Sequence, residues 1–125
     1  MNESIDTEMP AGETLAGARK RVLLRLRAER EAERLGIAIS PSRVQELARW
    51  FRGRFDLLTR CDMDAFFAAS GLTLAQFTRT MQAMAALDAV QRHHAREIED
   101  HLPNHRAIMS VRDFILLREQ SEVQP

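Results

Sequence analysis

Apolar residues recur three or four positions apart through most of the chain, and no segment alternates apolar with polar residues. Recurrence at three and four positions is typical of amphipathic α-helices, whereas alternation would indicate half-buried strands. The pattern therefore predicts an all-α fold, a compact bundle of about five helices preceded by a flexible acidic tail over residues 1–12. A single helical domain is expected at residues 13–120, which is within the usual size of one domain.

Capping residues predict the bounds of the first two helices. The first runs over residues 14–35, because Gly36 can adopt the left-handed conformation that ends a helix. Ser40 is a strong N-cap, and Pro41 follows at the first helical position, where a missing N–H costs nothing. The second helix then extends to about residue 55. Leu15, Val22 and Leu26 form one stripe of the first helix, which predicts its inner face.

Two further helices meet at a short junction. The first of them begins near Asp62 and ends at Gly71. Thr73 with Gln76 three residues later is a capping-box pattern, and it predicts the start of a long helix that reaches about Ile98.

Pro103 is expected to break the chain, because proline in a helix interior removes a backbone hydrogen bond. Asn104 would then cap a last helix, in which the apolar positions are Ile108, Val111, Phe114, Ile115 and Leu117.

The composition of the chain argues against several classes of protein, among them strongly basic nucleic-acid binders, disulfide-linked domains and membrane-spanning proteins. The 18 basic and 18 acidic side chains balance, so the whole chain has no general attraction for nucleic acid or an anionic membrane. Cys61 is the only cysteine, which excludes an intramolecular disulfide. The first residues are acidic and polar, unlike a secretory signal, and no apolar run is long enough to cross a membrane. These features predict a cytoplasmic protein without a membrane segment.

The charge is uneven within the first helix. Seven basic and three acidic side chains lie between Arg19 and Arg34, so this segment carries four net positive charges. A basic face could bind an acidic peptide or a phosphate backbone. The alternative is a solvated helix face with spaced ion pairs, such as Glu29 with Arg25 and Glu33 with Arg30.

Several stretches carry a resemblance to known helical proteins. They are Glu31-Ala32-Glu33-Arg34-Leu35-Gly36-Ile37 with Ile39-Ser40, then Val44, Phe51 and Phe66, then Gly71-Leu72-Thr73 and Phe77. This layout resembles the N-terminal helical domain of SurA-type chaperones and parvulin-type prolyl isomerases. It is also similar to the C-terminal helical region of TfuA-like proteins, which accompany YcaO enzymes in peptide modification. The resemblance covers roughly residues 27–92 and implies a chaperone-like or accessory helical module that holds a peptide or docks on an enzyme. No catalytic residue of those families maps onto this chain.

Two groups of side chains have residue types and spacings that could support catalysis or metal binding. His93, Glu97 and His101 are four residues apart and His105 follows beyond Pro103, a spacing at which imidazole and carboxylate groups can bind a transition metal. The alternative is a set of exposed polar side chains near a helix end. Cys61 has carboxylates at positions 62 and 64, which disfavour a reactive thiolate, so a packing role is favoured. The sequence therefore predicts no catalytic residue, no metal site and no cofactor.

Binding of another polypeptide is the function that the pattern favours. Large apolar side chains on different helices predict a groove that an arginine rim borders, formed by Trp50, Met63, Phe67 and Met81 with Arg25 and Arg30. The alternative is a helix-turn-helix regulator of DNA. In that case Gly71 makes the turn and Thr73, Gln76 and Arg79 begin the recognition helix. The sequence indicates no particular partner or oligomeric state.

Overall fold

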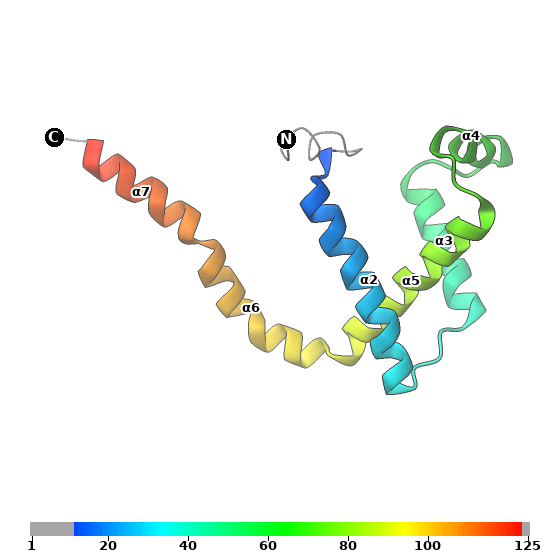
Figure 1. Cartoon of the computed structure of the whole chain (residues 1–125), viewed down its shortest axis with the longest axis horizontal. Coiled ribbons are helices and arrows are strands. Elements are labelled where there is room, and N and C mark those ends of the chain that lie inside the picture. Colours follow the sequence, from blue (N-terminus) through cyan, green and yellow to red (C-terminus); the bar gives the residue numbers. More distant parts are fainter. Residues whose placement is uncertain (1–11, 124–125) are drawn as a thin grey trace. The chain divides into compact units, whose positions relative to one another are not determined.

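The computed structural model describes residues 12–123, which form six α-helices and no strand. The helices are α2 (Leu15–Leu35), α3 (Pro41–Arg54), α4 (Arg60–Ser70), α5 (Leu74–His93), α6 (Ala95–Met109) and α7 (Val111–Val123) (Figure 1). The all-α class is therefore confirmed. Apart from Gly12, the predicted flexible tail over residues 1–12 lies outside the described residues.

The chain separates into two compact units, one ending at Val90 and the other beginning at Gln91. Unit 1 contains α2, α3, α4 and most of α5, and unit 2 contains the end of α5 with α6 and α7. The single domain that the sequence suggests for residues 13–120 stays a prediction.

The helix bounds of unit 1 follow the capping residues. The Thr14 side chain accepts a hydrogen bond from the Gly17 N–H at 3.0 Å, and Gly36 ends α2 in the left-handed conformation with φ 69°. Ser40 accepts from the Arg43 N–H at 3.2 Å at the start of α3. These caps confirm the predicted bounds of the first two helices.

The junction between α4 and α5 is also as predicted. Thr59 caps α4 by accepting from the Asp62 N–H at 3.1 Å, and Gly71 ends it with φ 75°. At the start of α5, the Thr73 N–H donates to Gln76 Oε1 at 2.9 Å and the Gln76 N–H donates to Thr73 Oγ1 at 3.1 Å. These two reciprocal bonds are the capping box, which satisfies two N–H groups that the first turn leaves open.

The core of unit 1 is centred on α5. Among the described residues the buried ones are Ala28 and Ala32 of α2 with Phe77, Met81, Ala83, Ala85 and Ala86 of α5. The Phe77 ring lies 5.4 Å from that of Phe51 and 5.8 Å from that of Phe67, so aromatic packing joins α3, α4 and α5. Ala28 and Ala32 are therefore the residues that α2 contributes to this core.

The predicted inner face of α2 is wrong. Ala28 and Ala32 are buried, whereas Val22 and Leu26 lie about half exposed on the opposite side. Residues that are two positions apart on an α-helix point about 200° away from each other, so Leu26 and Ala28 lie on opposite sides of α2. The buried residues of α2 are small alanines next to Glu29, which binds Arg79 of α5, and the periodicity of the larger side chains does not indicate that face.

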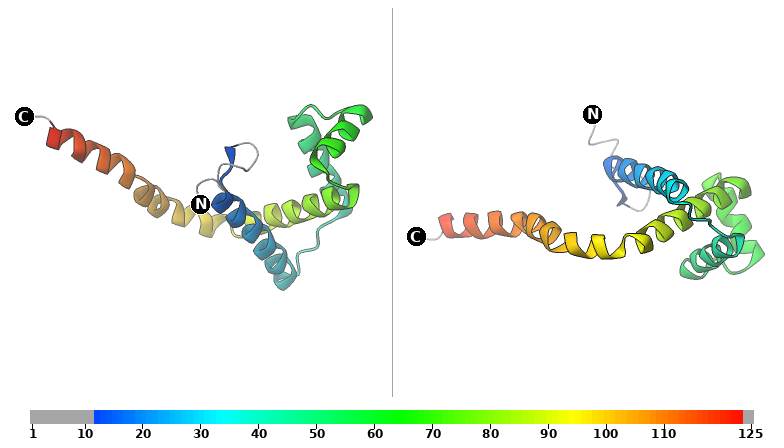
Figure 2. Two further views of the ribbon diagram at one scale, coloured as in Figure 1. Left: turned by 45° about the horizontal axis from the view of Figure 1, so that its top comes forward. Right: turned by 90° about the horizontal axis from the view of Figure 1, so that it is seen from below.

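Pro103 does not break the chain, in contrast to the sequence-based expectation. It lies inside α6, and Asn104 is therefore an internal residue and not a cap. The long helix ends earlier than expected, at His93, because His94 departs from helical geometry with φ −100° and ψ 18°. A second interruption at Ser110 separates α6 from α7, which gives one helix more than the sequence suggests. Both views in Figure 2 show α7 continuing onward from α6.

Candidate functional site

A groove of about 540 Å³ opens on unit 1. Its walls come from the second half of α2, the connector at residues 37–39, the first turns of α3 and the middle of α5. The lining residues are Glu29, Ala32, Glu33, Ile37, Ile39, Pro41, Val44, Gln45, Thr78, Arg79, Gln82 and Ala86. Apolar side chains from four segments therefore meet polar ones in a single concave surface, which is the usual character of a binding site.

An ion pair across the groove joins α2 to α5. Arg79 Nη2 donates to Glu29 Oε1 at 3.1 Å, and Arg79 Nη1 also contacts the other oxygen of Glu29. The hydrogen bonds that Arg79 donates to Glu29, together with the negative charge of Glu29, raise the pKa of Arg79 above its ordinary value. Glu33 also lines the groove and is exposed, so the three charged lining residues leave one net negative charge.

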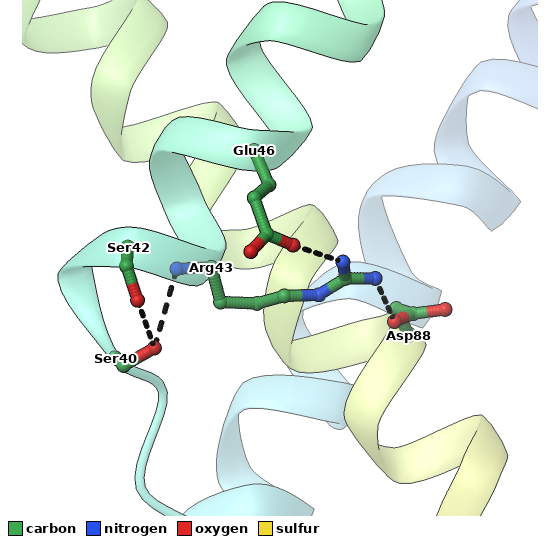
Figure 3. A network of polar contacts seen from close by, with 5 residues as sticks. All are labelled: Ser40, Ser42, Arg43, Glu46 and Asp88. Atoms are coloured by element: carbon green, nitrogen blue, oxygen red, sulfur yellow. Dashed lines mark hydrogen bonds and ion pairs between the residues drawn. The ribbon is translucent and has the colours of Figure 1, made fainter.

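The first turn of α3 is attached to α5 through Arg43 (Figure 3). Arg43 Nη2 donates to Asp88 Oδ2 at 2.6 Å, and Nη1 donates to Glu46 Oε2 at 2.9 Å. The pKa of Arg43 is raised above its ordinary value. The hydrogen bond to Asp88 is the largest cause, and the hydrogen bond to Glu46 is the next. Because Pro41 and Val44 flank Arg43, this contact holds the α3 wall of the groove against α5.

The side chains predicted to bind a partner lie at different depths. Trp50 is 56% exposed and Arg30 is exposed, whereas Met81 is only 2% exposed and belongs to the core. Phe67 and Met63 are half-buried, with Phe67 packed on Phe66 at 5.9 Å, and Arg25 is also half-buried. None of the six lines the groove described above, so their proposed role stays a prediction.

Sequence reasoning missed the groove because its walls are far apart along the chain. The apolar connector at residues 37–39 was the only local signal for it, since its two isoleucines had to be covered by something. They are half-buried and form part of the groove wall. The spaced ion pairs expected within α2 were also wrong for Glu29, which binds Arg79 of α5 instead of Arg25.

The helix-turn-helix order is present, but its expected reading side chains are engaged within the protein. Thr73 and Gln76 bond each other's N–H groups in the capping box. Arg79 binds Glu29 through both terminal nitrogens. Side chains that are held in this way are poorly placed to reach base edges in the major groove of DNA.

Cys61 and the histidines with Glu97, which could support catalysis or metal binding, do not form a shared site in the described part of the chain. Cys61 is exposed near the start of α4. His94 Nδ1 lies 3.5 Å from Glu97 Oε2, and the His93 ring meets the His94 ring edge-on at 4.9 Å. Within residues 12–123 no three His, Cys, Asp or Glu side chains gather closely enough to hold a metal ion.

Comparison with known proteins gives no relative for this chain: no protein-family model, curated protein or solved structure matches it. Among the helices described, none combines the length and the apolar character needed to cross a membrane. The groove and the exposed apolar surfaces are therefore the features of the chain that bear on its function.

Proposed function

We propose that this chain is a non-catalytic helical module that binds a peptide or protein segment in the groove of unit 1. The observation that supports it is a concave surface of about 540 Å³ whose walls carry Ala32, Ile37, Ile39, Val44 and Ala86. Apolar side chains at a groove of this volume bind apolar ligand groups because their contact removes both surfaces from water.

The ligand that fits this chemistry is a peptide with an apolar side chain next to a basic one. The charged lining residues leave one net negative charge, and Glu33 is the exposed carboxylate among them. A lysine or arginine of the peptide would pair with Glu33 while the neighbouring apolar side chain enters the groove. An acidic peptide would meet Glu33 with a like charge and bind more weakly.

Neutral polar groups of the groove suit a peptide backbone. Gln45 comes from α3, and Thr78 and Gln82 come from α5, so donors and acceptors stand on two separate helices. A glutamine amide both donates and accepts, which matches the alternating N–H and C=O groups of an extended peptide. Binding of this kind tolerates many sequences, as a peptide-holding module requires.

The resemblance to TfuA-like and SurA-type helical regions refines the proposal. It suggests that the bound segment belongs to a peptide undergoing modification or to the enzyme that modifies it. The module would then act as an accessory subunit, and the enzyme would supply the catalytic residues.

Fluorescence anisotropy with a labelled decapeptide tests the proposal. The probe carries two central leucines between lysines, and a second probe replaces the lysines with glutamates. We expect saturable binding of the lysine probe and at least severalfold weaker binding of the glutamate probe. Glu33→Lys should weaken binding of the lysine probe by about two- to fivefold, because exposed ion pairs contribute modestly. The matched control is Asp64→Lys, which reverses an exposed charge on α4 outside the groove.

Three outcomes would contradict the proposal. They are no binding of either peptide, equal weakening by Glu33→Lys and Asp64→Lys, or tight binding of a DNA duplex that decreases steeply with salt.

A further inference from the structure

Unit 2 has the apolar composition of a packed structure, but the residues whose burial the structure describes form no core there. No described residue of α6 or α7 is buried, although they carry the exposed apolar side chains Ile98, Ile108, Met109, Val111, Phe114, Ile115, Leu116 and Leu117. The two helices have 15 and 13 residues. Helices of about 12–15 residues are marginal in water without packing on one face. Unit 2 therefore needs a surface to pack against.

The backbone joins α6 and α7 into an almost continuous helical segment, which is the support along which a partner could pack. Ser110 between them has φ −75° and ψ −6°, close to helical values. Its N–H donates to the Arg106 carbonyl at 3.0 Å, and its carbonyl accepts from the Phe114 N–H at 3.1 Å. Both bonds are of the α-helical kind, in which each N–H reaches the carbonyl four residues earlier, so this bonding continues across the interruption at Ser110. Residues 95–123 thus extend over about 43 Å at about 1.5 Å per residue.

Apolar residues repeat every seven positions along this support. Ala95, Leu102, Met109 and Leu116 occupy one row, which we call the heptad row. Ile108 and Ile115 lie directly before two of its members. A seven-residue apolar repeat keeps one seam of a helix facing a partner helix, which is the pattern of a coiled coil.

Charges beside the heptad row indicate what that partner is. Glu99, Arg106 and Asp113 follow one another at seven-residue intervals on the same flank, with alternating sign. In a parallel pair of identical helices this flank faces the opposite flank of the partner, where His101, Ile108 and Ile115 offer no carboxylate or guanidinium to pair with. In an antiparallel pair Arg106 of one copy lies close to Asp113 of the other, and this contact occurs twice by symmetry. Within the described residues neither Arg106 nor Asp113 has an ion-pair partner of its own.

We propose that α6 and α7 pair with the same helices of a second copy of this chain, antiparallel and with the two-fold axis near Met109 and Ser110. Leu102 of one copy then packs near Leu116 of the other, and Met109 lies at the centre. The row next to the heptad row contains His105 and Arg112, so the seam is only partly apolar. The pair is accordingly reversible and forms as the protein concentration rises. It is independent of peptide binding in unit 1.

Sedimentation velocity of the full chain from about 1 to about 200 µM tests the pairing. We expect a shift from monomer to dimer over this range. Leu116→Asp should weaken the dimer at least about tenfold, because it puts a charge in the seam in both copies. Leu117→Asp is the matched control, since residue 117 points about 100° away from the heptad row and should change the dimer by less than about twofold. A monomer at all concentrations, or equal effects of the two variants, would overturn the proposal.

A charge exchange tests the orientation with exposed residues that cannot disturb a core. Arg106→Asp and Asp113→Arg should each weaken the dimer, because each places like charges opposite one another. The double variant should restore it, since the exchanged charges again pair across an antiparallel seam. A double variant no stronger than either single one would overturn the antiparallel pairing. Circular dichroism of each variant checks that the helical content is unchanged.

Discussion

The helices α5 and α7 are both rich in apolar residues, but α5 is packed in a core and the apolar side chains of α7 are exposed. Both carry apolar side chains on several sides, a composition that in a water-soluble protein is typical of a buried helix. In α5 this composition is matched by its surroundings, since Phe77 is 6% exposed. In α7 it is not, since Phe114 is 59% exposed.

Unit 1 therefore contains the partners of its central helix, whereas the described residues of unit 2 do not include partners that bury α7. In unit 1, α2, α3 and α4 pack around α5 through small and aromatic side chains. In unit 2 only α6 accompanies α7, and it continues onward from α6 instead of folding back on it (Figure 2). The heptad row of α7 therefore has no partner among the described residues of the unit, and we have proposed that a second copy of the chain covers this row while Phe114 stays exposed.

The largest expected effect comes from truncating one phenylalanine in each helix. Phe77→Ala should lower the free energy of unfolding by about 3–5 kcal/mol, because it leaves a cavity among the aromatic side chains. Phe114→Ala should change it by less than about 0.5 kcal/mol, because the ring is exposed and lies away from the heptad row. Urea unfolding of both variants measures the difference. Equal losses would mean that Phe114 is buried in solution, in contradiction to its exposure in α7.

The next effect concerns the proline inside α6. Pro103→Ala should stabilise α6 by up to about 3 kcal/mol, because it restores a backbone hydrogen bond in the helix interior. Circular dichroism and hydrogen exchange of α6 should report a more stable helix. Pro41→Ala is the matched control and should give no gain, because Pro41 occupies the first position of α3, where its N–H is not needed. A loss of helicity in Pro103→Ala would show that the proline supports a specific bend.

A smaller effect is expected at the glycine that leads into α5. Gly71→Ala should destabilise unit 1 by about 1–2 kcal/mol, because a Cβ at φ +75° is strained even though no atom lies within 4 Å of it. Gly53→Ala, inside α3 and equally open, should instead stabilise by about 0.5–1 kcal/mol. Thermal unfolding of the two variants should shift in opposite directions. Shifts of the same sign would contradict the left-handed end of α4.

The smallest effect compares the first turns of α5 and α7. Thr73→Ala removes half of the capping box and should cost about 1 kcal/mol. Ser110 precedes α7, but its hydroxyl donates to the Ala107 carbonyl at 2.7 Å and does not cap α7. Ser110→Ala should therefore change stability by only a few tenths of a kcal/mol. A loss from Ser110→Ala as large as that from Thr73→Ala would show that α7 has a cap after all.

Local sequence signals predicted the helices of unit 1 well. Gly36, Ser40 and Gly71 mark helix ends through backbone conformations that depend on few neighbours. Pro103 misled the prediction, since a proline that costs one hydrogen bond can still lie inside a helix whose other bonds are kept. The long helix α5 instead ends next to His94, where no neighbouring glycine or proline would allow the break to be predicted.

The groove was much harder to predict than the helices. The Glu29–Arg79 contact joins residues 50 positions apart, and no periodicity within one helix indicates it. Likewise, Leu26 looked like a core residue because large apolar side chains dominate the stripe, yet Ala28 and Ala32 make the buried contact. Tertiary packing decides which of two faces of the same helix is buried. The local sequence of that helix does not show which face this will be.

Hydrogen exchange of the full chain at a low and a high protein concentration tests most directly whether α7 is covered by a second copy. The backbone amides of α5 should exchange slowly at both concentrations, because unit 1 holds them without help. Those of α7 should exchange quickly in dilute solution and more slowly in concentrated solution, as the pair forms. Amides of α7 that exchange at the same rate at both concentrations would contradict the account.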